Sequence, residues 1–163
     1  MTVIVLGIDP GTANTGYGVV LAHGQRLAAL DGGVIATEAH EPLEKRLVRI
    51  HARVCDLIRE HAPHAVAIED LFFGNNARSA FSVGQARGAV MLSAGLCGVP
   101  AYSYTPQAVK QAVCGSGRAE KGQVQRMVQA LLSLQEVPEP DHAADALAVA
   151  ICHANGAPMR AAV

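Results

Sequence analysis

The pattern of hydrophobic residues near the N-terminus predicts three consecutive β-strands. Residues 3–8 are continuously apolar, which is typical of a central strand that is buried on both faces. A Pro-Gly pair ends this run, and two further strands are expected over residues 16–22 and 26–36, with a His-Gly turn between them. Because these connections are short, we expect the three strands to form an antiparallel meander.

Helical periodicity begins after the third strand. Between positions 42 and 61, apolar residues recur every three or four positions, which predicts an amphipathic helix. The short apolar run 65–68 comes next, and because a helix separates it from the meander, we expect its strand to run parallel to its neighbour. A long helix over 77–96 and a fifth strand over 101–104 follow.

The C-terminal part of the chain is expected to be helical, with helices over residues 106–113, 120–134 and 141–154. The whole order of elements predicts an α/β fold: a mixed five-stranded sheet, made of an antiparallel meander plus parallel strands, flanked by helices. No internal repeat or linker interrupts this pattern. We therefore expect one domain over residues 1–163.

The composition is typical of a compact folded protein, because half of the 163 residues are hydrophobic and only 17% are charged. Because no secretory signal is evident, a location in the cytoplasm is expected. The first residues lack the basic segment and cleavage site of a signal peptide, so a strand is expected there. Glycines and prolines in the longest uncharged stretch, 88–107, argue against a membrane span. The cysteines at positions 55, 97, 114 and 152 match neither zinc spacing nor a secreted disulfide framework, so reduced thiols are expected.

Two carboxylates occupy equivalent places in the predicted sheet. Asp9 directly follows the apolar run 3–8, and Glu69 directly follows the apolar run 65–68. If these strands are parallel neighbours, both acids lie at the carboxyl edge of the sheet, where α/β folds build their sites. Taken singly, Asp9 is also an ordinary turn residue and Glu69 an ordinary solvated strand end. Two acids that face one point repel each other unless a cation lies between them, so the pair favours a metal site.

The last predicted helix adds further polar side chains to an otherwise apolar, alanine-rich segment. His142 and Asp145 are three positions apart and share a face, and Asp141 lies four positions before Asp145. The helix dipole accounts for an acid at Asp141, in the first turn, but poorly for one a turn deeper. Oxygen-rich ligands without cysteine favour Mg²⁺ or Mn²⁺ over zinc.

The net charge of −1 is unusual for a protein that binds nucleic acid, so any DNA affinity must come from a local basic cluster. Lys110, Arg118 and Lys121 surround a glycine-containing loop, where backbone and basic side chains could both approach phosphates. Arg78 is a weaker candidate for the same role. An exposed helix surface with basic side chains would give the same pattern.

Two of the three phenylalanines, Phe72 and Phe73, directly follow the second acid on a loop flanked by Gly and Asn. They are candidates for stacking on unpaired bases, with core packing as the alternative. The next helix carries Ala80, Gly84 and Gly88 at four-residue spacing. This stripe of small residues allows close approach either to a second copy of the chain or to the protein's own sheet.

Taken together, the motifs resemble those of the RuvC family of Holliday-junction resolvases over nearly the whole chain. The segments that carry the resemblance are, in order, GIDPGTANTGYGVV, AIEDLFFGNNARSA, GQARGAV, QAVKQAVCGSGRAEKGQVQRMV and DHAADALAVAI. The resemblance implies a ribonuclease-H-like fold and a homodimer that nicks two strands of a four-way DNA junction symmetrically, leaving 5′-phosphate and 3′-hydroxyl ends. It also implies a RuvAB-type branch-migration complex as a partner.

The resemblance further implies roles for individual residues. Asp9, Glu69 and Asp145 fall on catalytic positions that hold two Mg²⁺ or Mn²⁺ ions. His142 falls on the fourth position, where many members carry Asp. Lys110 and Lys121 match positions near the cleaved phosphate.

Three alternatives stay open at this point. The GIDPGTANTG segment also resembles the phosphate-binding turn of actin-like and sugar-kinase-like proteins, although 163 residues are too few for their two domains. A related branch of nucleases processes ribosomal RNA precursors. A junction-binding protein without catalysis is conceivable because His142 stands where an acid is common.

Overall fold

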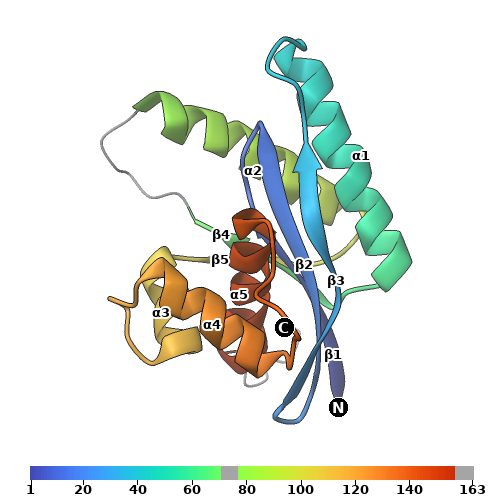
Figure 1. Cartoon of the computed structure of the whole chain (residues 1–163). Coiled ribbons are helices and arrows are strands. Elements are labelled where there is room, and N and C mark those ends of the chain that lie inside the picture. The colour runs from blue at the N-terminus through green and yellow to red at the C-terminus, as the bar shows by residue number, and fades with distance from the viewer. Residues whose placement is uncertain (71–76, 157–163) are drawn as a thin grey trace.

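The computed structural model describes residues 1–70 and 77–156, which form a five-stranded mixed sheet covered by helices on both faces (Figure 1). The sheet order is β3-β2-β1-β4-β5. The strands are β1 (Thr2–Asp9), β2 (Asn14–His23), β3 (Arg26–Ala36), β4 (Ala65–Glu69) and β5 (Ala101–Tyr104). The first three form an antiparallel meander, while β4 runs parallel to both β1 and β5. The predicted mixed sheet is confirmed.

Five helices complete the described part of the chain. They are α1 (Leu43–His61), α2 (Ala77–Leu96), α3 (Pro106–Cys114), α4 (Lys121–Leu131) and α5 (Asp141–Gly156). Within the described residues, no helix combines the length and the hydropathy needed to cross a membrane.

The alternation of side chains along β1 divides the core into two layers. Val5 packs in one cluster with residues of α3, α4 and α5, whereas Leu6 and Ile8 pack in the other with residues of α1 and α2. Both faces of β1 are therefore covered, which explains why its sequence is continuously apolar instead of alternating. Figure 1 shows α5 lying along one face of the sheet, with α3 and α4 beside it.

The helix predicted over 120–134 is shorter in the structure, because α4 ends at Leu131. Ser133 has a φ of +53°, a left-handed conformation that ends a right-handed helix. Leu134 continues the apolar periodicity but lies in the turn after the helix, where its backbone N–H donates to Gln129 at 2.9 Å. Periodicity alone could not separate a packed turn from a further helical turn.

Glycines in the sheet allow α5 to approach unusually closely. A Cβ atom added at Gly7 of β1 would lie 2.0 Å from the carbonyl oxygen of Ala146, and one at Gly16 of β2 would lie 1.9 Å from that of His142. Real Cβ atoms never come so near to backbone oxygens. The first turns of α5 can therefore lie directly on β1 and β2 only because these positions have no side chain.

We predict that Gly7→Ala lowers the free energy of unfolding by at least about 1–3 kcal/mol, since the added methyl group must displace α5. The control is Gly88→Ala, at an exposed position of α2 with open space around it, which should raise stability by about 0.5–1 kcal/mol through helix propensity. Urea denaturation measures both changes. Unaltered stability of Gly7→Ala would contradict the close approach of α5.

Candidate active site

The two acids predicted at the sheet edge emerge side by side. In the parallel pairing of β1 with β4, Ile8 lies opposite Ile68, so the residues that follow them, Asp9 and Glu69, are neighbours at the carboxyl edge. Both are partly shielded from solvent. Parallel pairing is the feature that brings these acids together, because two antiparallel strands would end at opposite edges.

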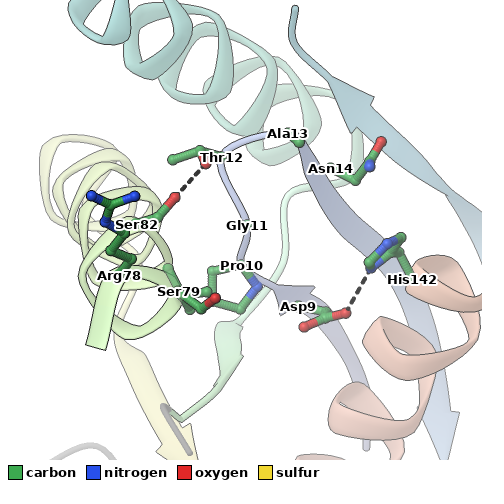
Figure 2. Close-up of a pocket in the computed structure, with 11 residues that line it drawn as sticks. Asp9, Pro10, Gly11, Thr12, Ala13, Asn14, Arg78, Ser79, Ser82 and His142 are labelled. Carbon is green, nitrogen blue, oxygen red and sulfur yellow. Dashed lines mark hydrogen bonds and ion pairs between the residues drawn. The ribbon is translucent and has the colours of Figure 1, made fainter. Parts of the chain in front are cut away.

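Helix α5 adds its polar residues to the same edge. His142 Nδ1 lies 3.2 Å from a carboxylate oxygen of Asp9, and Figure 2 shows the two side chains facing each other. Asp145, one turn further along α5, lines a pocket of about 220 Å³ together with Glu69. The structure thus brings the four predicted catalytic residues, from β1, β4 and α5, to one region of the surface.

Burial, and then repulsion between like charges, disfavours ionised carboxylates in this region. Burial, and then the charges of Asp9 and Asp145, raise the pKa of Glu69 to about 8. Burial, followed by the charge of Asp9, also raises the pKa of Asp145. The charge of Asp9 therefore opposes the ionisation of both Glu69 and Asp145 in the protein without metal. A divalent cation among them would remove this penalty, so the donor set of carboxylate oxygens plus one imidazole fits Mg²⁺ or Mn²⁺.

No three of these four residues have ligand atoms that all lie within 4.8 Å of one another. Within residues 1–70 and 77–156, one group of possible ligands has all its donor atoms within 4.8 Å of one another: Asp31, Glu60 and His61, from β3 and α1. This group includes none of the four predicted residues, and its closest pair, His61 and Asp31, is joined at 2.9 Å. Mutual repulsion gives a physical reason for the wider spacing among the acids of the candidate site.

Two of the predicted DNA-binding lysines border the acidic pocket. Lys110 of α3 and Lys121 of α4 line it together with Glu69 and Asp145. The Lys121 ammonium lies 3.1 Å from Asp141 and 4.0 Å from Asp145. Asp141 is exposed and hydrogen-bonds to this lysine, which holds the pKa of the Asp141 carboxyl below its usual value. In this structure Asp141 therefore pairs with Lys121, and it also accepts a hydrogen bond from Gln125.

A second pocket, of about 540 Å³, is lined by Asp9 and Arg78 (Figure 2). It is lined by the loop after β1, by the first turns of α2 and by His142. The loop is fixed to α2 by a hydrogen bond of 2.5 Å between the Thr12 and Ser82 hydroxyls. Ser79 and Ser82 also line this pocket and were not predicted from the sequence. They follow Arg78 by one and four positions on the same helix, and this proximity to a predicted DNA-binding residue could have indicated them.

One predicted DNA-binding residue in the described part of the chain, Arg118, lines neither of these two pockets. Arg118 lines a separate pocket between α3 and the glycine loop, away from the acids. Phe72 and Phe73 lie outside the described residues. Arg87 forms an ion pair with Asp70 at 3.6 Å and a hydrogen bond with Ser103, which is a structural role for this arginine.

Comparisons with known proteins agree with this geometry. The family model described as crossover junction endodeoxyribonuclease RuvC matches residues 5–153. A protein of that name from Desulfitobacterium hafniense is 55% identical over 93% of this chain and 92% of its own length. Another from Moorella thermoacetica is 54% identical over 96% of this chain and 94% of its own. The Thermus thermophilus RuvC structure in complex with a Holliday junction substrate is 45% identical, with a TM-score of 0.91 over 95% of this chain and 94% of that chain.

The fold and the acidic sheet edge define a nuclease of the ribonuclease-H-like class. Within that class, the chain belongs to the RuvC family of crossover junction endodeoxyribonucleases. This assignment excludes the actin-like and sugar-kinase-like alternative and the branch that processes ribosomal RNA precursors. Membership of a nuclease family and the clustered acids together support a divalent metal cofactor.

We predict that the metal-free protein loses stability as the pH rises from about 4.5 to about 8, the interval between the ordinary and the native pKa of Glu69. The native carboxyl holds its proton more tightly than the unfolded chain does, so ionisation opposes folding. Glu69→Gln, which cannot ionise, should be more stable than the wild type by roughly 5 kcal/mol at pH 9 and equal to it at pH 4.

Urea denaturation in the presence of a chelator measures this difference, and Glu44→Gln on the exposed surface of α1 is the matched control. A wild-type protein with constant stability across this pH range would show that Glu69 is not under repulsion from its neighbours.

Proposed function

We propose that this protein is a metal-dependent endonuclease that resolves four-way DNA junctions by paired symmetric nicks in recombination and repair. The observation that carries the proposal is the similarity, over nearly the full length of both chains, to a RuvC structure that holds a Holliday junction substrate. The acids at the sheet edge and the lysines beside them supply the chemistry that such a reaction needs.

In this proposal Asp9, Glu69, Asp145 and His142 hold two Mg²⁺ or Mn²⁺ ions. Bound divalent ions supply the positive charge that offsets the negative charge building up on a phosphodiester during hydrolysis. Asp9 lines the pocket that contains His142, and its charge acts on Glu69 and Asp145 of the other pocket, so it is the candidate that would contact both ions. Its carboxylate also orients the imidazole of His142, at 3.2 Å.

The basic residues bind and position the substrate. Lys110 and Lys121 line the acidic pocket and neutralise oxygens of the cleaved phosphate, while Arg78, in the pocket lined by Asp9, contacts the DNA backbone. Arg118, in its separate pocket, contacts DNA further from the cut. We keep Phe72 and Phe73 as candidates for stacking at the junction centre. Cleavage leaves 5′-phosphate and 3′-hydroxyl ends, which a ligase can seal.

Symmetric nicking needs two active sites, and α2 offers a surface on which two copies can meet. Its exposed apolar side chains include Phe81, Leu92 and Leu96, which are 71%, 57% and 69% exposed. Gly88 lies among them with open space around it, so the small-residue stripe does not pack there on the protein's own sheet. We therefore propose that two copies of the chain form a homodimer through α2. Each copy is a single domain over residues 1–163.

Two parts of the proposal rest on family membership alone. These are cooperation with a RuvAB-type branch-migration complex and a location in the cytoplasm, where the DNA of a bacterium lies.

The function is tested with a labelled synthetic four-way junction and Mg²⁺ or Mn²⁺, with linear duplex DNA and an RNA–DNA hybrid as control substrates. We expect paired nicks in the junction only. Asp9→Asn should abolish cleavage while junction affinity stays within about tenfold, because phosphate contacts supply most of the binding energy. Cleavage by Asp9→Asn at near the wild-type rate would contradict the metal assignment, and a wild-type protein that binds junctions without cutting them would favour the non-catalytic alternative.

The role of Lys110 gives a separate prediction. Lys110→Ala should weaken junction binding or slow cleavage, and a lost binding contact should lower the slope of log affinity against log salt by about one. Lys45→Ala, at an exposed position of α1 on the other face of the sheet, is the matched control. Identical rates and salt slopes for the two variants would leave Lys110 as an ordinary surface residue.

The imidazole of His142 predicts a metal preference. A neutral imidazole binds Mn²⁺ well, whereas Mg²⁺ prefers oxygen ligands, so the wild type should work better with Mn²⁺. His142→Asp should raise the rate with Mg²⁺ relative to the rate with Mn²⁺. Asp141→Ala is the control, because in this structure Asp141 pairs with Lys121. Loss of activity in Asp141→Ala, together with full activity in His142→Ala, would show that Asp141 is the metal ligand and His142 is not.

A further inference from the structure

Two thiols meet on the face of the sheet opposite to α5, where α1 packs against α2. Cys55 lies on α1, and Cys97 is the residue that directly follows α2. Their Sγ atoms are 3.6 Å apart, although the residues are 42 positions apart in the chain. Cys55 is buried, with 6% of its surface exposed, and Cys97 is partly exposed.

The surroundings fix both cysteines in place. The ring of His51 lies 3.8 Å from Cys55 Sγ, and its Nδ1 lies 2.8 Å from the Ser93 hydroxyl. The backbone N–H of Cys97 donates to Ser93 at 3.0 Å. The next residue, Gly98, has a φ of +71°, so the chain turns away from α2 immediately after the thiol.

We propose that Cys55 and Cys97 form a reversible disulfide bond that ties the C-terminal end of α2 to α1, and that this pair is a redox modification site distinct from the candidate active site. A disulfide bond is about 2.05 Å long, so the sulfur atoms must approach by about 1.5 Å. Rotation of the partly exposed Cys97 side chain can supply much of this movement without moving either helix.

The oxidant is a soluble low-molecular-weight disulfide, and the reaction is thiol–disulfide exchange. Burial and the neighbouring thiol raise the pKa of Cys55, so the more accessible Cys97 reacts first. Its thiolate attacks the soluble disulfide, forms a mixed disulfide and releases one thiol. Cys55 gives its proton to His51 and attacks the Cys97 sulfur, which releases the second thiol. The two protein thiols are oxidised, and one soluble disulfide is reduced to two thiols.

The bond would connect a redox change to the helix that borders the candidate active site. The first turns of α2 carry Arg78, Ser79 and Ser82 into the pocket beside Asp9 (Figure 2). The proposed disulfide would fix the other end of the same helix. Closing a loop of this length in the unfolded chain stabilises the folded protein. For a protein of 163 residues we expect the Tm to rise by about 5–10 °C on oxidation.

The other two cysteines serve as internal controls. Cys114 ends α3, and Cys152 is buried on α5 with its thiol donating to the carbonyl oxygen of Ala108. Burial raises the pKa of Cys152 to about 11, which suppresses its reaction with a soluble disulfide. Neither has another sulfur within hydrogen-bonding distance in the described part of the chain.

The experiment incubates the purified full-length protein with glutathione buffers of increasing oxidised fraction. Free thiols are then alkylated under denaturing conditions and counted by intact mass, the linkage is mapped by peptide mass spectrometry, and the Tm is measured. We expect two of the four thiols to be lost together, a Cys55–Cys97 cross-linked peptide, the rise in Tm, and full reversal by a reducing agent.

The variant Cys97→Ser should keep Cys55 free and show no rise in Tm, whereas Cys114→Ser should behave like the wild type. Four alkylated thiols in the oxidised wild type, a glutathione adduct that stays on Cys97 without closing, or a linkage between other cysteines would each overturn the proposal. So would a rise in Tm that persists in Cys97→Ser.

Discussion

The direct contact of α5 with β1 and β2 is the constraint on which the candidate site depends. Gly7 and Gly16 remove the side chains that would hold the helix away, and the alanines of α5 present a flat surface to them. This contact places His142 and Asp145 beside an acid of the sheet. The same packing buries the acids, and burial turns their proximity into strong repulsion.

That repulsion gives the region its chemistry. In the proposed function these carboxylates, unfavourable together as ions, hold a divalent cation, so stability, metal binding and catalysis depend on the same side chains. Lys110 and Lys121 line the pocket that contains Glu69 and Asp145, and Arg78 lines the pocket that contains Asp9. A net charge of −1 is therefore compatible with the proposed DNA binding, because these three basic residues stand beside the acids.

Much of this architecture could be predicted from the sequence, because its signals are local. The uninterrupted apolar run before Asp9 indicated a central strand, and the helical segment before β4 indicated parallel pairing, which together placed Asp9 and Glu69 at one edge. What could not be predicted depends on contacts between distant residues. The end of α4 depends on the left-handed turn at Ser133, and the pairing of Arg87 with Asp70 depends on how α2 crosses the sheet edge. The meeting of Cys55 and Cys97 likewise depends on how α1 packs on α2, since widely spaced cysteines carry no signal of pairing.

The most direct test of the central claim is a calorimetric titration of the wild-type protein with Mn²⁺ at pH 7, repeated in buffers that differ in ionisation enthalpy. If the acids converge as described, Glu69 is largely protonated before metal binds and must lose its proton when metal enters. The account predicts Mn²⁺ binding with the release of about one proton at this pH, and loss of that release in Glu69→Gln. Binding without proton release, or no binding of Mn²⁺, would contradict it.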